Sequence, residues 1–362
     1  MPTHPPHERP RKGRGATLNL EGRFASCEHT RDDDGWGSLD EPLPPLETVV
    51  QPEAARSIVS RNDSPDLPFT QSINPYRGCE HGCVYCYARP SHAYVDLSPG
   101  LDFETKLFYK RDAAARLAET FRRRGYRPSP IMLGANTDAY QPIERELRVT
   151  RSILEVMRDF RHPVAIITKS ALVLRDVDLL AELAADDLVQ VTVSITTLDA
   201  EVKRTLEPRA AGPAARLRAV RELRSAGVPT GVMIAPVIPA ITDHEIERIV
   251  AAAADAGAER AGYVMLRLPY EVKTLFRAWL EAHYPQRAAH VMSLVHEMRG
   301  GRDNDPRFGT RMRGEGAYAE LIARRFRVAC RRHGLPRAET RTLRTDLFAP
   351  PARRGDQLDL LT

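Results

Sequence analysis

The stretch INPYRGCEHGCVYCYA, residues 73–88, contains three of the chain's five cysteines. Cys79, Cys83 and Cys86 are spaced C-x3-C-x2-C, and the aromatic residue Tyr87 follows the third. Three thiolates this close together can bind three corners of an iron–sulfur cube, whose fourth iron then has no protein ligand nearby in the sequence. An open iron is a place for chemistry, so the spacing predicts catalysis rather than simple electron storage.

A structural zinc site is the alternative interpretation of this loop. Zinc in such sites takes four ligands, commonly as two C-x2-C pairs or with histidine partners. The fourth ligand would have to be His81, Cys27 or Cys330, and His81 lies between the first two cysteines, where ring closure would be cramped. The loop also follows the first strand of an alternating strand–helix series, which favours the iron–sulfur cluster.

Short β-branched runs alternate with helical patterns from residue 71 onward. Each inner run is short and nearly all apolar, which is typical of parallel strands that are covered on both faces. Six strand–helix repeats predict an α/β barrel, open or closed, with right-handed crossovers. The expected strands are 71–76, 131–135, 164–168, 189–196, 230–235 and 263–267.

Helical patterns fill the intervals between these strands, at 112–124, 150–160, 176–185, 213–226 and 242–256. Local signals at the ends of two helices agree with this assignment. Pro213 suits a first helical turn and Gly227 a C-cap, while Thr242 and Glu245 have the spacing of a capping box.

Polar residues recur where the expected strands end. Cys79 follows the first strand, the run 136–138 (Asn-Thr-Asp) follows the second and Lys169 follows the third, while Ser194 lies in the fourth and Arg267 ends the sixth. In barrels of parallel strands the active site forms at the carboxyl ends of the strands. We therefore expect the cysteine loop to lie at the catalytic rim.

The charge balance permits a nucleic-acid partner but does not establish one. The chain has 53 basic and 48 acidic residues, a formal net charge of +5 and a pI of about 9.0. Only six of the basic residues are lysines, and an arginine excess is also typical of chains encoded by GC-rich genomes. Because acidic residues nearly balance the charge, composition alone does not indicate phosphate binding.

Cysteine usage and hydropathy indicate the cellular compartment. Five cysteines, with three of them in eight residues, argue against a disulfide scaffold and favour metal ligation in a reducing compartment. No apolar run approaches the roughly 18 residues that span a bilayer, so we expect no membrane partner. Residues 1–15 lack the apolar stretch of a secretory signal. The expectation is a cytoplasmic enzyme.

The chain divides by composition into an extension, a core, a helical segment and a tail. The expected boundaries are 1–65 for the irregular N-terminal extension, 66–270 for the core barrel, 271–335 for the helical C-terminal segment and 336–362 for the tail. Within the extension, the proline-rich run 42–46 could lie as a strap over the folded body. Within the helical segment, 299–313 reads as a loop-like interruption rich in arginine.

The cysteine stretch resembles the signature of the radical S-adenosylmethionine (radical SAM) superfamily. More narrowly, the chain is similar to the spore photolyase-like branch, often labelled DNA repair photolyase, over roughly residues 71–269. The C-x3-C-x2-C-aromatic motif supports the first resemblance, and runs at 74–79, 137–144, 167–170, 193–197 and 207–209 support the second. The resemblance implies a partial (βα)6 TIM-type barrel of radical SAM type.

The same resemblance implies the cofactors. A [4Fe-4S] cluster would be bound by Cys79, Cys83 and Cys86, and its remaining iron would bind the amino and carboxylate groups of S-adenosylmethionine. One electron, from a reductant such as flavodoxin or ferredoxin, would split the S–C5′ bond into methionine and a 5′-deoxyadenosyl radical. That radical would abstract hydrogen from a substrate, in a site that excludes water and competing hydrogen donors.

Four further positions carry over from the family pattern. Tyr87 resembles the aromatic residue beside the adenine, and Thr137 and Ser194 are placed like hydroxyl contacts to the cofactor. Lys169 is placed to pair with the methionyl carboxylate. Lysine is rare in this chain and Lys169 ends an apolar strand, which favours function over an exposed loop residue. Ser194 fits the interpretation of a barrel-core hydroxyl equally well.

Several polar residues admit two interpretations. Asp138, Gln141 and Glu144, together with Tyr140, either contact the cofactor or substrate, or Glu144 pairs with an arginine at the surface. Arg209 and Arg267 either bind a phosphate or carboxylate or are ordinary surface residues.

One position departs from the pattern of the branch. Where spore photolyase carries the cysteine that returns a hydrogen atom to the product, this chain has Asn136, which has no weak S–H bond. Three hypotheses therefore remain: a radical SAM enzyme of unassigned substrate, a DNA repair lyase of the spore photolyase type, and a zinc-stabilised nucleic-acid-binding module without turnover. The substrate, the electron donor and the oligomeric state do not follow from the sequence.

Overall fold

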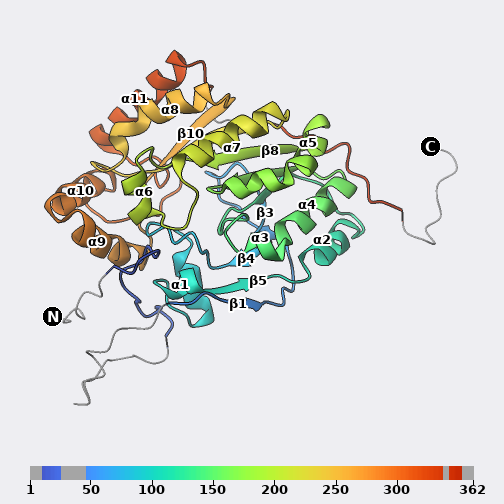
Figure 1. Ribbon diagram of the computed structural model, residues 1–362, viewed down its shortest axis with the longest axis horizontal. Helices are drawn as coiled ribbons and strands as arrows, with labels where there is room; N and C mark the ends of the chain where they lie inside the picture. Colours follow the sequence, from blue (N-terminus) through green and yellow to red (C-terminus); the bar gives the residue numbers. More distant parts are fainter. Residues whose placement is uncertain (1–9, 26–45, 337–341, 353–362) are drawn as a thin grey trace.

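The centre of the fold is a seven-stranded sheet in the order β10-β9-β8-β7-β6-β3-β2. Its strands β10, β8 and β3 are labelled in Figure 1. The structure is a computed structural model that describes residues 10–25, 46–336 and 342–352. Six of the strands are parallel, and β2 (Ser60–Arg61) is antiparallel to β3. Because β2 and β10 stand at opposite ends of the strand order, the barrel is partial, which confirms the expected fold.

The six parallel strands overlap the six ranges expected from the sequence. They are β3 (Gln71–Ile73), β6 (Ile131–Leu133), β7 (Val164–Thr168), β8 (Val189–Ser194), β9 (Thr230–Val237) and β10 (Arg260–Met265). Most of their residues are buried, because helices pack on one face and the barrel interior on the other. The alternating pattern therefore predicted the sheet correctly.

The helices between these strands, labelled in Figure 1, lie close to the ranges expected from the sequence. They are α2 (Ala113–Phe121), α4 (Val149–Asp159), α5 (Val177–Ala185), α7 (Pro213–Ser225) and α8 (Ile246–Asp255), with α6 (Ala200–Leu206) as a short addition that the sequence did not predict. As expected, α7 begins at Pro213, and Gly227 follows its end with φ of +79°.

The expected capping box at Thr242 is wrong. The Thr242 hydroxyl oxygen accepts a hydrogen bond from the Ile238 amide at 2.9 Å, and no described side chain caps this end. The Glu245 carboxylate accepts from the Leu198 amide at 2.9 Å and from the Thr197 hydroxyl. Both side chains form hydrogen bonds to residues outside the expected capping box. The local spacing of Thr242 and Glu245 therefore did not determine their partners.

A small second sheet lies beside the barrel and was not predicted. Its order is β1-β5-β4, formed by β1 (Val49–Pro52), β5 (Lys106–Tyr109) and β4 (Tyr76–Arg77). The expectation of irregular structure throughout residues 1–65 is therefore wrong for β1 and β2. Residues of β1 are mostly exposed and become a strand only by pairing with β5, some 57 positions later. Two short helices, α1 (Asp102–Thr105) and α3 (Glu144–Leu147), were also not expected.

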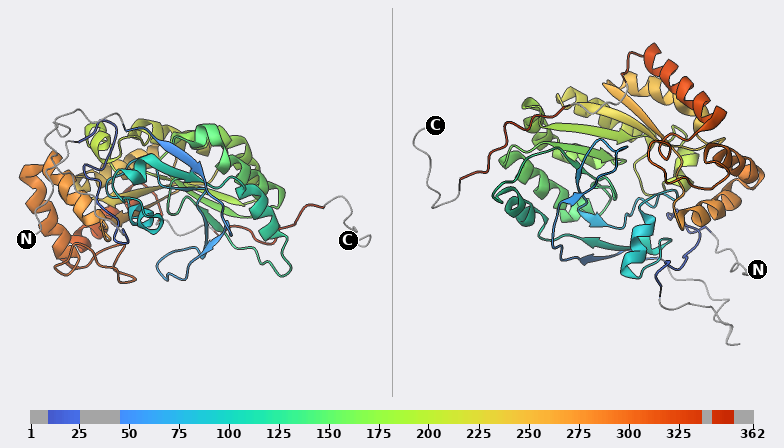
Figure 2. Two further views of the ribbon diagram at one scale, coloured as in Figure 1. Left: turned by 90° about the horizontal axis from the view of Figure 1, so that it is seen from below. Right: turned by 180° about the vertical axis from the view of Figure 1, so that it is seen from behind.

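The helical region after residue 270 is confirmed. It consists of α9 (Val272–His283), α10 (Pro285–Met298) and α11 (Gly316–Arg332), and a loop at 299–315 joins the last two. These helices gather at the β10 end of the sheet, with α10 against α9 and α11, and α11 against α8 (Figures 1 and 2). The four-segment division of the chain stays a prediction.

The described C-terminal residues 342–352 lie at the amino ends of the strands, away from the cysteine loop. The Arg344 amide donates to the Asp187 carbonyl and the Ala349 amide to the Phe160 carbonyl, each at 3.1 Å. The expected strap at 42–46 and Cys27 lie outside the described residues, apart from Leu46. Cys330 is buried, as expected.

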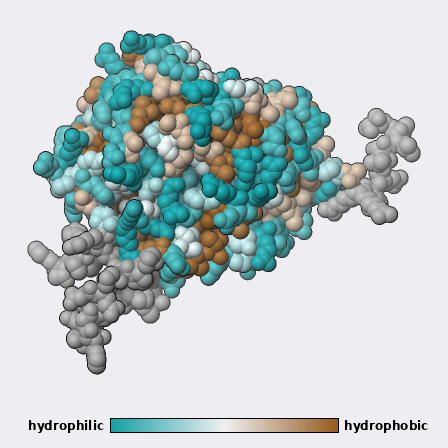
Figure 3. All heavy atoms as spheres, in the orientation of Figure 1, coloured by the Kyte–Doolittle hydropathy of each residue, from teal (hydrophilic) through white to brown (hydrophobic). Residues whose placement is uncertain are grey.

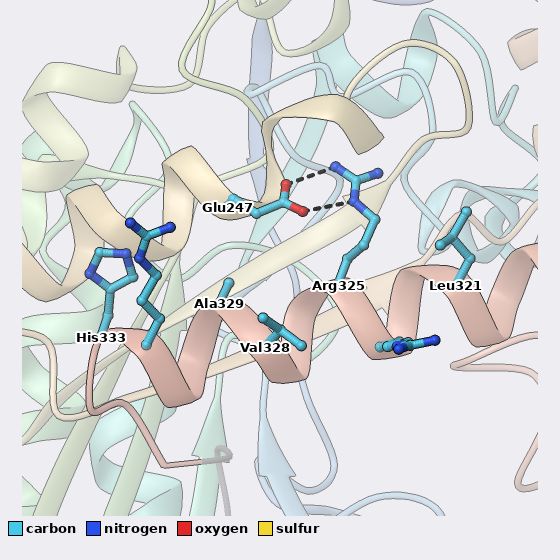
Figure 4. Close-up of a pocket in the computed structure, with 8 residues that line it drawn as sticks. Glu247, Leu321, Arg325, Val328, Ala329 and His333 are labelled. Carbon is cyan, nitrogen blue, oxygen red and sulfur yellow. Dashed lines mark hydrogen bonds and ion pairs between the residues drawn. The ribbon is translucent and has the colours of Figure 1, made fainter.

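Small apolar patches are separated by hydrophilic side chains on the face shown in Figure 3. One groove lies between α8 and α11, where Leu321 and Val328 are about half exposed beside the Glu247–Arg325 ion pair (Figure 4). It includes no residue of the cysteine loop. Among the described residues, no helix is long and apolar enough to cross a bilayer.

Candidate active site

The cysteine loop leaves the carboxyl end of β3, at the rim where the sequence placed it. Cys79 and Cys83 are each 7% exposed, Cys86 is partly buried, and all three thiols are free of disulfide bonds. The Cys79 amide donates to the Phe103 carbonyl at 2.9 Å, and the Val84 amide donates to the Leu206 carbonyl at 3.1 Å. Backbone bonds to two distant segments therefore hold the loop.

The Gln141 side chain clamps the loop on both sides of its first cysteine. Its Oε1 accepts from the Glu80 amide at 2.8 Å, and its Nε2 donates to the Gly78 carbonyl at 3.2 Å. Arg209 supports the same turn, because its guanidinium pairs with the Glu80 carboxylate at 2.6 Å. Gln141 and Arg209 thus have structural partners in the loop.

The N-terminal segment 10–25 covers the outer side of the cysteine loop. The amides of Gly15 and Ala16 donate to the Glu104 carboxylate at 3.0 and 2.8 Å. A Cβ on Gly15 would stand 1.8 Å from the Gly82 carbonyl oxygen, so only glycine permits this approach. In the sequence this segment is a glycine-rich run that resembles an irregular tail. The contact between the segment and the cysteine loop was therefore not predicted.

A buried charged cluster lies beneath the loop. The Glu207 carboxylate pairs with Arg216 and accepts hydrogen bonds from the hydroxyls of Tyr85 and Thr196. Burial alone would raise the pKa of Glu207, but Arg216 and Lys169 outweigh it and lower that pKa to about 2. The carboxylate is therefore ionised inside the protein. Sequence reasoning used Glu207 only as part of a motif and gave it no role.

Asp138 joins the cysteine loop to two strand ends. Its carboxylate accepts from the Thr168 hydroxyl and the Lys169 amide, each at 2.7 Å, and lies 3.4 Å from the His81 ring nitrogen. Burial alone would raise its pKa, but His81 and these hydrogen bonds hold the pKa well below its usual range. The carboxylate therefore positions the loop against β7.

The structure places Tyr87 in the cysteine loop, and Thr137, Lys169 and Ser194 at or just beyond the carboxyl ends of β6, β7 and β8. The Lys169 ammonium stands 5.8 Å from the ring centroid of Tyr85; burial lowers its pKa, but Cys83 and Glu207 outweigh this and raise it. Tyr87 is 48% exposed and its hydroxyl donates to the Ala135 carbonyl. Ser194 is buried at the end of β8.

The Thr137 hydroxyl is already engaged. It is buried and donates to the Tyr76 carbonyl at 2.7 Å, so only its oxygen lone pairs remain to meet a ligand. Glu144 is fully buried and pairs with Arg175 at 2.6 Å. The ion pair, one of the two interpretations of Glu144, is therefore present, but it lies in the interior and not at the surface. The cofactor contacts at Tyr87, Thr137, Lys169 and Ser194 stay predictions.

The surroundings of the loop cysteines favour the neutral thiol at two of the three positions. Burial, with Glu207 nearby, raises the pKa of Cys83 to about 12, and burial raises that of Cys79 as well, so both stay protonated until a cation binds. Within the described residues, no three His, Cys, Asp or Glu side chains converge as ligands of one ion. Separate corners of an iron–sulfur cube do not require such convergence.

A family model described as "Radical SAM superfamily" matches residues 73–253, which are half of the chain. The chain belongs to the radical SAM superfamily. The match begins at the end of β3 and ends in α8, so it covers the cysteine loop and most of the partial barrel. Membership implies a [4Fe-4S] cluster and S-adenosylmethionine as cofactors, and the cysteines for the cluster are present.

Curated proteins that are similar to this chain in sequence carry the name "uncharacterized protein". Proteins of Mycobacterium tuberculosis (strain ATCC 25618 / H37Rv) and Mycobacterium bovis are each 36% identical over 230 residues, covering 63% of this chain and 68% of theirs. A protein of Methanocaldococcus jannaschii is 28% identical over 214 residues, covering 59% of this chain and 76% of its own.

Solved structures with the same fold include spore photoproduct lyases. One, complexed with dinucleoside spore photoproduct, has a TM-score of 0.54 and 17% identity, covering 78% of this chain and 79% of its own. A tyrosine-to-phenylalanine mutant of spore photoproduct lyase has a TM-score of 0.53 and 17% identity, covering 79% of each chain. At this identity the likeness shows the fold alone.

Proposed function

We propose that the chain reductively cleaves S-adenosylmethionine at a [4Fe-4S] cluster held by Cys79, Cys83 and Cys86. The proposal depends mainly on three free thiols in one loop at the carboxyl rim of a radical SAM barrel. When bound, such a cluster supplies the electron that splits the S–C5′ bond into methionine and a 5′-deoxyadenosyl radical, which takes a hydrogen atom from the substrate. A small one-electron carrier such as flavodoxin or ferredoxin would be the reductant.

Residues around the loop would hold and orient S-adenosylmethionine. The Lys169 ammonium would pair with the methionyl carboxylate, where its buried surroundings strengthen the attraction. The Tyr87 ring would contact the adenine, and Thr137 and Ser194 would offer hydroxyl contacts. The interior beneath the loop is filled by the Glu207 cluster, which would help to exclude water from the radical.

Reconstitution tests this function directly. The full chain is loaded anaerobically with iron and sulfide, then reduced with dithionite in the presence of S-adenosylmethionine. We expect about four irons per chain and release of 5′-deoxyadenosine. Cys83→Ala should lose both, whereas Cys330→Ala, at a buried thiol outside the loop, should keep both. A fully loaded wild-type protein that releases no 5′-deoxyadenosine under any reducing condition contradicts the proposal.

The zinc-stabilised module gives a different result in the same preparation. Anaerobically purified protein would contain zinc and no acid-labile sulfide, with a fourth ligand outside the loop. Iron with sulfide excludes this alternative.

A DNA repair lyase of the spore photolyase type is a narrower version of the proposal. The likeness to spore photoproduct lyases supports it at the level of fold. Asn136 weighs against the same hydrogen-return step, because an amide has no weak S–H bond; its backbone amide donates to the Asn74 side chain at 2.8 Å. Binding to single-stranded or duplex DNA that weakens steeply with salt would support a nucleic-acid substrate, and no binding at low salt would exclude it.

A further inference from the structure

The loop 299–315 returns to the carboxyl end of β10, the last strand of the sheet. The Met265 amide donates to the Met312 carbonyl at 2.9 Å. Arg299, only 2% exposed, donates to the carbonyls of Leu266, Thr310 and Arg311 at 2.6 to 3.1 Å. One interior guanidinium therefore fixes the loop to the strand end, next to the rim that carries the cysteine loop.

Arg311 in this loop reaches the other end of the sheet. Its Nε donates to the Asp66 carboxylate at 2.6 Å, and Asp66 lies between β2 and β3. Since β2 and β10 are the two ends of the strand order, the Arg311–Asp66 pair joins the segments on either side of the barrel's open edge.

Arg267, just beyond β10, has no such partner in the described chain. The hydrogen bond that its side chain makes there is to the Met312 sulfur at 3.5 Å, a weak acceptor, and its Nε is buried without a partner. Among the described residues no carboxylate pairs with Arg267, nor with the neighbouring Arg299, whereas the partly buried Arg175 pairs with Glu144 and Asp176. Burial and the nearby Arg311 lower the pKa of Arg267.

Two exposed aromatic rings flank these guanidiniums. The Arg267 Cζ lies 5.7 Å from the ring centroid of Tyr87, and the Arg311 Cζ lies 4.6 Å from that of Phe308. Tyr87 is 48% and Phe308 is 55% exposed, so two exposed aromatic side chains lie beside two partly buried cations here. Asp66 is the only carboxylate within ion-pairing distance of either guanidinium in the described chain, so the pair of arginines keeps an excess positive charge.

We infer that Arg267 and Arg311 form a binding site for an oxyanion of the substrate, a carboxylate or a phosphate group, and that Asp66 competes for this site in the free protein. An incoming oxyanion would satisfy the unpartnered Arg267 fork and could displace Asp66 from Arg311. The substrate would then be held beside Tyr87, next to the third cysteine. The inference rests on the proposed function, because only that function makes a position beside Tyr87 a substrate site. Its test is a binding measurement that needs no cleavage of S-adenosylmethionine.

The test compares charged probes with neutral counterparts on the reconstituted full chain at low salt. Glycerol 3-phosphate is compared with glycerol, and succinate with succinamide, by isothermal titration calorimetry. We expect at least one charged probe to bind, and Arg267→Gln to weaken that binding about tenfold, as for loss of a charge-assisted contact. Whether glycerol 3-phosphate or succinate binds distinguishes the two sources of the oxyanion. Neutral probes should not respond to the substitution.

Asp66→Asn should change the affinity for the charged probe in the opposite direction to Arg267→Gln. A purely structural role of the Arg311–Asp66 pair would not produce this change. Removing the competing charge should tighten binding of the same probe severalfold, although it breaks an ion pair. Arg218→Gln, at an exposed arginine that pairs with Glu222 on its own helix, is the matched control and should change nothing. If Arg267→Gln reduces the folded fraction, Arg267→Lys keeps the charge without the fork and should bind the probe at intermediate strength.

The inference is overturned if neither charged probe binds, if Arg218→Gln weakens binding as much as Arg267→Gln, or if Asp66→Asn leaves binding unchanged or weaker. Each of these outcomes can occur in a protein that releases 5′-deoxyadenosine normally. Loss of 5′-deoxyadenosine with normal probe binding would instead contradict the proposed function.

Discussion

Glu104 is a buried carboxylate on which the cysteine loop depends, although it stands outside the cysteine motif. It is fully buried and pairs with Arg89, which is also fully buried. Arg89 further donates to the carbonyls of Cys83 at 2.9 Å and Gly100 at 2.8 Å. A buried ion pair is tolerated only when its remaining donors and acceptors are satisfied, and both residues meet that condition here.

Glu104→Gln should therefore destabilise the protein strongly. The substitution leaves the Arg89 charge buried without its partner, which typically costs about 3–5 kcal/mol. Urea unfolding of the purified chain measures the change. Glu201→Gln, in an exposed pair with Arg204 on α6, should change the free energy of unfolding by less than about 0.5 kcal/mol. Equal effects at the two sites would refute the assigned role of Glu104.

At the scale of elements, the N-terminal segment shows how tertiary contacts order a stretch without its own periodicity. Gly15 approaches the Gly82 carbonyl, and the Asn19 side chain accepts from the Leu101 amide at 2.9 Å. The Arg14 guanidinium donates to the Glu104 carbonyl at 3.1 Å. These bonds tie residues 10–25 to the cysteine loop and to α1, so the segment forms part of the wall around the site.

Gly15→Ala should loosen this wall. The added Cβ would overlap the Gly82 carbonyl, so the segment or the loop must shift, at a cost of about 1–3 kcal/mol. We expect the reconstituted variant to lose most of its iron in air faster than the wild type does. The decrease of its visible absorbance with time measures this rate. Gly212→Ala is the matched control, because its φ is −67° and open space surrounds it. Equal bleaching rates for both variants would show that the segment does not protect the loop.

At the scale of the whole molecule, the two rims of the barrel are closed by different parts of the chain. The cysteine loop and residues 10–25 lie at the carboxyl rim, while residues 342–352 cover the amino rim. There the His162 ring stacks on Phe121 at 4.2 Å between centroids, bonds the Tyr126 hydroxyl at 2.8 Å and meets the Phe348 ring edge-on. Burial lowers the pKa of His162 to about 4.

The free energy of unfolding should consequently fall as the pH drops below the pKa of a free histidine, about 6.5. The folded protein holds His162 neutral, and the unfolded chain takes up the proton near pH 6.5, so the stabilisation is complete above that pH and is lost toward pH 4. His92, whose pKa burial also lowers to about 4, acts in the same direction. Each contributes up to roughly 3 kcal/mol.

Urea unfolding at about pH 7 and about pH 5 measures this dependence. His162→Gln should lower stability at the higher pH and reduce the difference between the two conditions, whereas a substitution at the exposed His333 should leave the difference unchanged. A pH dependence that His162→Gln does not reduce would mean that other groups cause it.

Local pattern was sufficient where a residue's neighbours lie close in sequence. The apolar runs of β7 and β8, the Pro213 start of α7 and the spacing of Cys79, Cys83 and Cys86 could all be predicted, because periodicity, backbone restriction and short-loop ligation act within a few residues. Family membership and the location of the cysteine loop at the carboxyl rim followed from the same stretch.

The partners of single side chains depended on the folded chain. Thr242 and Glu245 had the spacing of a capping box and bonded elsewhere, β1 formed only because β5 offers an edge, and Gln141 became a clamp on a loop some 60 residues away. The sequence by itself determined the alternating framework and the cluster ligands, since those depend on local spacing. Only the tertiary structure decided which buried charges meet and which guanidiniums, Arg267 among them, are left without a carboxylate, because these depend on distances between segments that no local pattern encodes.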